Sequence, residues 1–249
     1  MISKFWHGWR QRRRVTAAWG CAMGEEVTHL VALGAQAGDR WRVLESLQWP
    51  VAQAGTAGAE DEPLIDAGLL RQALLAPAVM AHPQARQCTL SLPRSRCVMG
   101  HAAWPADWAE EEVAAQVQVE AAAALDLAPQ ALGFDYQTDG PPGPAGALQQ
   151  WCWAACARSE LRPLRQAFRG QSLQLFAVEP AELAARRAWQ HLREGPSALW
   201  SLPVADWHFE RLPQRDEALE LPGDLGDFPQ LVACGLALAP LMRAHAPGA

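Results

Sequence analysis

Lysine is almost absent from this sequence: Lys4 is the only one among 249 residues, and every other basic residue is arginine. No interior lysine is therefore available for Schiff-base chemistry, and no Walker A motif is present. Long apolar runs are missing too, because a membrane-spanning helix needs about 18 such residues and the nearest run, 231–242, is shorter. The start of the chain lacks the apolar core of a secretory signal. We therefore expect a cytoplasmic protein.

Catalytic motifs are equally scarce. The seven histidines form neither H-E-x-x-H nor H-x-x-x-H, and there is no G-x-S-x-G motif or glycine-rich dinucleotide loop. His29 lies in an apolar run, where we expect a hydrogen-bonded core residue. Glu110, Glu111 and Glu112 open a predicted helix, where acidic side chains favour the helix dipole. A structural role is preferred for them over paired catalytic carboxylates.

The six cysteines do not form a zinc-binding pattern. Only Cys152 and Cys156 are close, in the apolar run WCWAAC, and no second pair or histidine cluster completes a site. Because an unpaired cysteine behaves as a small hydrophobic residue, buried thiols are expected and no metal is predicted.

Charge is unevenly distributed along the chain. The net charge is −6, although residues 1–14 alone contribute Lys4 and four arginines. The remainder is acidic and would repel a phosphate backbone, so nucleic-acid binding is not expected. The basic start also carries aromatic side chains at near-helical spacing. It is either a segment that rests on an anionic membrane surface or a solubilising leader. The residues that would contact a membrane are Trp6, Trp9, Arg12, Arg13 and Arg14.

Four regions can be drawn: 1–15, 16–86, 87–179 and 180–249. The second opens with apolar runs at 27–33 and 41–49, joined by turn residues, which predict a β-hairpin. The fourth begins with a helix opened by Pro180. It ends in FPQLVACGLALAPLM, which is apolar all round and predicts a buried helix.

The third region, 87–179, has the clearest pattern. Its predicted elements alternate as β-α-β-β-α-β, which is the ferredoxin-like order. The first helix has a capping-box pattern at Asp107 and Glu110, and the second begins at Ser159 and stops at Gly170. The predicted strands are 88–92, 132–137, 149–157 and 172–178, and the apolar stripe of the first helix is Val113, Val117, Ala121, Ala124 and Leu125.

Several motifs together resemble the PilM family, the actin-like proteins of type IV pilus assembly. WGCAMGEEVTHLVAL is similar to the opening phosphate hairpin of that family, and CTLSLP through FAVEP to its inserted subdomain 1C. DFPQLVACGLALAPL resembles its closing helix. The length is closest to short, truncated HofM-type members. The resemblance implies an α/β fold: an actin-like, FtsA-like lobe with an inserted ferredoxin-like 1C subdomain and a reduced second lobe.

The phosphate hairpin departs from the family pattern. An aspartate orients Mg²⁺ there, and small residues let backbone N–H groups hold the phosphates. In this chain the aspartate is replaced by alanine and the following serines by two glutamates, which would repel phosphate. We therefore expect neither ATP nor Mg²⁺ to bind and no enzymatic activity. The remnant of the loop comprises Gly20, Ala22, Gly24, Glu25 and Glu26.

The resemblance implies a partner as well. In PilM, a groove between subdomains 1A and 1C receives the cytoplasmic N-terminal peptide of the bitopic inner-membrane protein PilN. The implied function is a non-catalytic scaffold, peripheral to the inner membrane, for pilus, competence or secretion assembly. The alternatives are an actin-like ATPase that controls assembly, or an α/β domain unrelated to pili. The corresponding partner-binding residues are Leu92, Pro93, Arg94, Trp104 and Trp108.

Overall fold

The computed structural model describes residues 15–24, 27–50, 67–92, 94–138, 144, 146–195, 197–211 and 228–244. The chain divides into two compact units. We call the unit built from residues before 94 and after 163 the body, and the unit of residues 94–163 the insert. Of the sequence-based predictions, the membrane-surface segment 1–14, Glu25, Glu26 and Pro93 lie outside the described residues.

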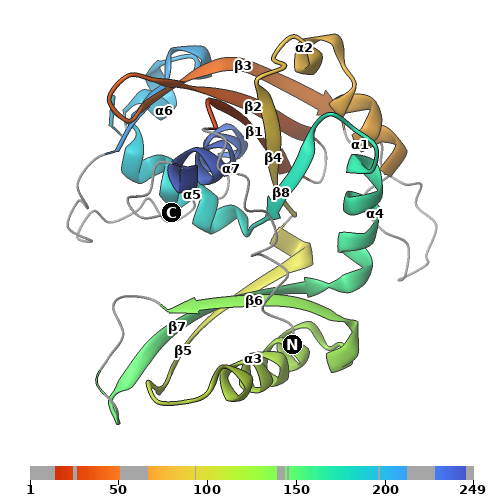
Figure 1. Ribbon diagram of the computed structural model, residues 1–249, viewed down its shortest axis with the longest axis vertical. Coiled ribbons are helices and arrows are strands. Elements are labelled where there is room, and N and C mark those ends of the chain that lie inside the picture. The colour runs from red at the N-terminus through yellow and green to blue at the C-terminus, as the bar shows by residue number, and fades with distance from the viewer. Residues whose placement is uncertain are drawn as a thin grey trace. The chain divides into compact units, whose positions relative to one another are not determined.

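The body contains a six-stranded mixed sheet in the order β8-β4-β1-β2-β3-β9 (Figure 1). Neighbouring strands β1, β2 and β3 are antiparallel, β4 runs parallel to β1, and β8 runs parallel to β4. The strands are β1 Ala17–Met23, β2 Val27–Gln36, β3 Arg40–Pro50, β4 Ala85–Ser91, β8 Gln174–Val178 and β9 His208–Glu210.

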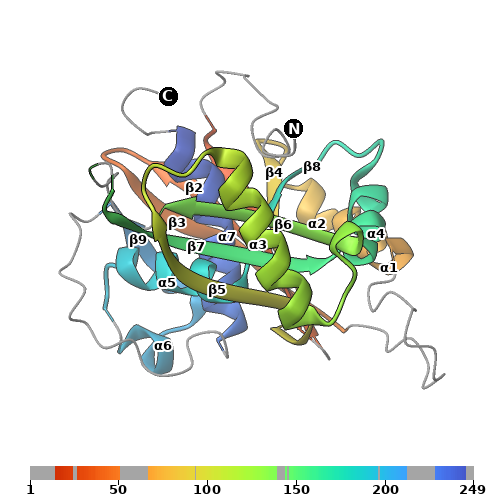
Figure 2. The same ribbon diagram turned by 90° about the horizontal axis from the view of Figure 1, so that it is seen from below.

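Short and long helices complete the body. They are α1 Ala67–Leu74, α2 Pro77–Met80, α5 Ala181–His191, α6 Ala198–Ser201, the 3-10 turn Val204–Asp206 and α7 Pro229–Ala244. Helix α4, Arg158–Phe168, starts in the insert and ends in the body, where it lies beside α1 in both ribbon views (Figures 1 and 2).

Helix α7 lies between the sheet and α5. It is buried almost all round, as its sequence predicts, because one side packs on β1 and β2 and another packs on α5. The approach is close at two glycines. A Cβ on Gly20 in β1 would overlap the backbone of Ala233, and a Cβ on Gly235 would overlap the backbone of Ala184 in α5. Both glycines are therefore required by packing.

The predicted hairpin of residues 27–49 is confirmed as β2 and β3. Its turn places Gly38 and Asp39 at positive φ, 76° and 51°, a conformation that glycine and aspartate adopt more readily than most residues. The hairpin that resembles the opening hairpin of the PilM family is confirmed as β1 and β2.

The insert is a three-stranded antiparallel sheet with α3 on one face (Figure 2). Its strand order, β5-β7-β6, leaves β5 and β6 at the two edges among the described strands. Val113, Val117 and Ala121 of the predicted stripe are buried against the sheet, whereas Ala124 is exposed. The elements are 3-10 turns Arg94–Arg96 and Pro129–Ala131, β5 Cys97–Pro105, α3 Glu110–Leu125, β6 Leu132–Thr138 and β7 Leu148–Ala157.

The elements predicted for 87–179 occur in the predicted order, but they do not form one ferredoxin-like unit with a single sheet. Strands β4 and β8, which begin and end that range, hydrogen-bond to the body sheet because β1 offers a parallel edge to β4. The insert also contains β5, a strand that the sequence did not indicate. Residues 94–163 form the compact insert, and the described part of 180–249 packs into the body rather than into a separate second lobe.

The start of α3 differs from prediction as well. The helix begins at Glu110 with Ala109 as its N-cap, and the Glu112 carboxylate accepts a hydrogen bond from the Ala109 N–H at 2.8 Å. The reciprocal glutamate of the capping box is thus two residues later than predicted. Its role at the helix start agrees with the structural interpretation of the acidic cluster.

Candidate functional site

The β1–β2 hairpin corresponds to the predicted phosphate loop. Its turn is tight: the Gly24 N–H donates a hydrogen bond to the Val27 carbonyl at 3.1 Å, and a Cβ on Gly24 would lie 2.7 Å from that oxygen. Ala22 precedes the turn and is buried on the face of the sheet that packs against α7. Of the described remnant residues, Ala22 and Gly24 lie at the turn, while Gly20 lies in mid-strand beneath α7.

No described side chain at this turn replaces the missing aspartate. The residue directly opposite Ala22 on β2 is His29, which is neutral at neutral pH because burial lowers its pKa. A methyl group and a neutral imidazole cannot hold Mg²⁺ in the way that carboxylate oxygens do. Neither of these two side chains therefore replaces the metal-binding carboxylate of a phosphate loop.

His29 differs from the prediction of a hydrogen-bonded core residue. Its side chain is buried, but its Nδ1 atom has no hydrogen-bond partner within the described chain. Burial lowers the pKa of this imidazole because the charged form loses its hydration. The same cause lowers the pKa of His191, whose ring contacts the Glu210 carbonyl at 3.0 Å.

These two histidines predict acid sensitivity. The folded state binds their protons more weakly than the unfolded state does, so no penalty exists well above pH 6.5 and one develops as the pH falls below it. We expect the free energy of unfolding to decrease between pH 7.5 and pH 5.5. In urea titrations the His29→Gln variant should show a shallower decrease. An unchanged pH dependence in that variant would rule out His29 as a source.

An aromatic cluster covers one end of the insert sheet, on its α3 side. Trp104 stacks on Trp108 with ring centroids 6.0 Å apart, and its ring lies 6.4 Å from that of Trp151. Tyr136 meets Trp151 edge-on at 5.8 Å and donates a hydrogen bond to the Glu110 carbonyl at 3.1 Å. The aromatic cluster therefore connects the start of α3 with side chains from all three strands of the insert.

The predicted partner-binding residues are distributed over this arrangement. Trp104 is buried and chiefly a core residue, whereas Trp108 is only half-buried in the connection between β5 and α3. Leu92 is buried in the body, and Arg94 begins the 3-10 turn that leads into β5. The structure brings Trp104 and Trp108 together, and of these two Trp108 is the more accessible.

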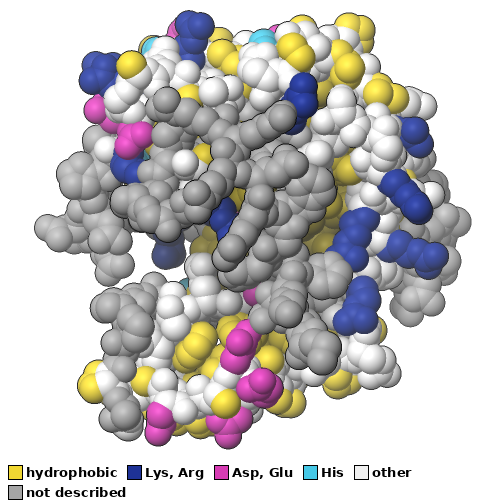
Figure 3. Space-filling view, viewed as in Figure 1, with side chains coloured by type: hydrophobic (Ala, Val, Ile, Leu, Met, Phe, Trp, Pro, Cys, Tyr) yellow, Lys and Arg dark blue, Asp and Glu magenta, His cyan; other side chains and the backbone are white. Residues whose placement is uncertain are grey.

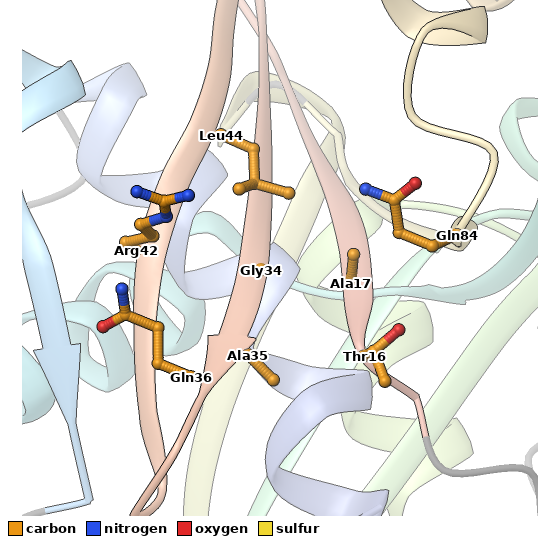
Figure 4. Close-up of a pocket in the computed structure, with 8 residues that line it drawn as sticks. All are labelled: Thr16, Ala17, Gly34, Ala35, Gln36, Arg42, Leu44 and Gln84. Carbon is orange, nitrogen blue, oxygen red and sulfur yellow. The ribbon is translucent and has the colours of Figure 1, made fainter.

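A pocket of about 280 Å³ opens on the body sheet at the end opposite to Gly24 (Figure 4). Arg42 is its single charged residue; Gln36 lies on the same side of the pocket as Arg42, and Gln84 lies on the opposite side (Figure 4). The pocket is separate from the phosphate hairpin and includes none of the predicted site residues. Its lining is Thr16, Ala17, Gly34, Ala35, Gln36, Arg42, Leu44 and Gln84.

Two buried cysteines, Cys21 and Cys156, are unreactive at neutral pH. Burial raises the pKa of the Cys21 and Cys156 thiols to about 12, so neither is a thiolate nucleophile at neutral pH.

Within the described ranges, no three side chains of histidine, cysteine, aspartate or glutamate are grouped to hold a metal ion. Among the described helices none is long and apolar enough to cross a membrane.

This chain is similar to known proteins in its fold. No protein-family model matches the chain, and no curated protein matches it in sequence. A solved structure of a PilM-PilN type IV pilus biogenesis complex superposes with a TM-score of 0.57 at 17% identity, over 72% of this chain and 51% of that one. The chain shares the fold of PilM. It spans about half the length of the PilM-PilN chain that it matches.

Two further structures superpose less well. One is the cytoplasmic domain of EpsL, an inner-membrane component of the type II secretion system of Vibrio cholerae, with a TM-score of 0.46 at 12% identity over 68% of this chain and 58% of that one. The other is a protein with an actin-like ATPase fold and unknown function from Bacteroides thetaiotaomicron, with a TM-score of 0.40 at 7% identity over 72% and 60%.

The predicted actin-like α/β fold is confirmed by the likeness to PilM. At 17% identity the likeness to PilM shows the fold alone, and it shows neither the binding partner nor the chemistry of this chain.

Proposed function

We propose that this protein is a non-catalytic scaffold of a type IV pilus or related secretion or competence machine. In this role it binds the cytoplasmic N-terminal peptide of a PilN-like bitopic protein and is thereby held in the cytoplasm at the inner membrane. The observation that carries the proposal is the fold shared with a protein whose structure was solved as a complex with PilN. The missing acid at Ala22 supports a role other than nucleotide hydrolysis.

Strand β5 is the proposed docking edge. It pairs with β7 on one side, and it is an edge strand among the described strands of the insert. An edge strand presents backbone N–H and C=O groups to which an extended peptide can add as a further strand. Trp108 lies three residues beyond the end of this strand and offers a half-buried aromatic contact for a peptide side chain. A peptide bound in this way would gain affinity from the backbone and specificity from the indole.

The proposal predicts that Mg-ATP leaves the melting temperature unchanged. A ligand at 100 times its dissociation constant stabilises a folded protein by ~2.7 kcal/mol. For a protein of this size such a gain would raise the melting temperature by roughly 5–10 °C. A thermal-shift titration with Mg-ATP up to millimolar concentration measures this directly. A saturable rise would revive the ATPase alternative.

A further inference from the structure

Arginine side chains gather over α1 and α4 (Figure 3). Within α4, Arg158, Arg162 and Arg165 are all exposed, and Arg169 follows in the turn after the helix. These positions are spaced by four, three and four residues, so at 3.6 residues per turn they fall within about 60° of one another. We call Arg162, Arg165 and Arg169 the α4 basic face.

The α4 basic face carries no acidic residue of its own helix. Glu160, the only acidic residue of α4, is buried and pairs with Arg96 at 3.2 Å. The opposite side of the helix is apolar, because Leu164 and Phe168 are buried. The helix is thus amphipathic, with arginine concentrated on its outer side.

Helix α1 extends the same surface. The Gln171 amide, oriented so that its oxygen accepts, receives hydrogen bonds from Arg71 at 2.8 and 3.2 Å, which joins α1 to the turn after Arg169. Leu75, one turn beyond Arg71, is 49% exposed, and Met80 at the end of α2 is 50% exposed. A large exposed apolar side chain, Leu75, therefore lies one turn from the arginine of α1.

We propose that the α4 basic face docks on an anionic phospholipid surface. A guanidinium group binds phosphate oxygens through paired hydrogen bonds, and each basic residue adds to the attraction towards anionic headgroups. The exposed Leu75, one turn from Arg71, suits a membrane interface better than an acidic peptide, since an apolar side chain can enter the headgroup layer. The whole chain has a net charge of −6, so attraction to an anionic surface depends on a local concentration of arginine such as this face.

This inference is independent of the proposed peptide binding. A protein could bind a PilN-like peptide through the insert without contacting lipid, or contact lipid without binding the peptide. The two activities therefore have separate measurements, and the failure of one leaves the other standing.

The test is co-sedimentation of the full chain with vesicles of phosphatidylcholine containing 30 mol% phosphatidylglycerol. We expect the wild-type chain to bind these vesicles and not pure phosphatidylcholine, and to dissociate as salt rises. Since each basic residue near an anionic surface contributes about fivefold, Arg162→Gln, Arg165→Gln and Arg169→Gln together should weaken binding at least about tenfold. The matched control carries the same charge change at Arg42, Arg186 and Arg193, which are exposed elsewhere on the body.

Two outcomes would overturn the inference. One is equal vesicle binding by the α4 variant and the control variant. The other is an absence of binding by the wild-type chain, including the case in which it binds an acidic peptide instead. Substitution of the same three arginines by lysine keeps the charge and should retain most of the binding. This variant separates lost charge from lost folding, so a poorly folded glutamine variant does not leave the inference undecided.

Discussion

Replacing Gly235 with alanine is expected to lower the free energy of unfolding by about 3 kcal/mol, the upper part of the range for overpacked cores. The added Cβ would overlap the carbonyl group of Ala184, which belongs to the α5 backbone and cannot move aside as a side chain can. Helices α5 and α7 would have to separate, and both also pack in the main core of the body. Urea denaturation monitored by tryptophan fluorescence measures the change.

Gly20→Ala should behave similarly, because its Cβ would overlap the backbone of Ala233 on the other side of α7. The control is Gly68→Ala: this glycine is exposed in α1, where alanine favours the helix by roughly 0.5–1 kcal/mol. If Gly235→Ala proves as stable as the parent protein, the close packing of α7 between the sheet and α5 is wrong.

Arg96→Met is expected to destabilise the insert by about 3 kcal/mol at neutral pH, the lower end of the cost of leaving one partner of an ion pair buried alone. The Glu160 side chain is only 5% exposed, and Arg96 is its ion-pair partner at 3.2 Å. Burial already raises the pKa of Glu160, and the Arg96 charge opposes that rise. Without the arginine, the carboxylate would remain buried without compensation.

The pH dependence distinguishes this cause from lost packing. A carboxyl group with a raised pKa in the folded state is destabilising when ionised, so the cost of Arg96→Met should be larger at pH 7.5 than at pH 5. Adding Glu160→Gln should recover part of the loss, because it removes the buried charge. Equal costs at both pH values, with no recovery in the double variant, would show that the ion pair is unimportant.

Some elements are predictable because their sequence pattern reports burial directly. The segment that forms α7 is apolar on every side, which is required of a helix covered by both a sheet and a second helix. The β2–β3 hairpin is equally evident, because apolar strands flank a turn with Gly38 and Asp39. In both cases the local sequence determines the local structure.

The errors in predicting the strands have a different cause. Strand β5 contains Gly100, whose missing side chain leaves room for the Trp153 indole, so the usual β-branched pattern is absent. The sequence predicts β4 and β8 as strands, but the parallel pairing of β4 with β1 and of β8 with β4 joins segments far apart in the sequence. Pairing partners of this kind are not encoded in any local pattern.

The candidate sites could also be predicted only in part from the sequence. The loss of the phosphate-loop acid at Ala22 can be seen in the sequence, because the surrounding hairpin is similar to that of PilM. The sequence does not show that Trp104 is buried and Trp108 accessible, because both depend on how the residues at and after the end of β5 pack against Trp151. The arginine spacing in α4 was available from the sequence at 158, 162, 165 and 169, and it is the signal that would have indicated the basic face.

The most direct test of the scaffold role is a fluorescence anisotropy titration of the labelled N-terminal peptide of the neighbouring PilN-like protein with the full chain. We expect saturable binding that unlabelled peptide displaces and a scrambled peptide does not. Trp108→Ala should weaken binding by about tenfold, as for an aromatic interface residue. Trp200→Ala, which removes an indole that is 64% exposed in the body, should have no effect. No saturable binding up to high micromolar concentration would contradict the proposed function and leave the shared fold alone.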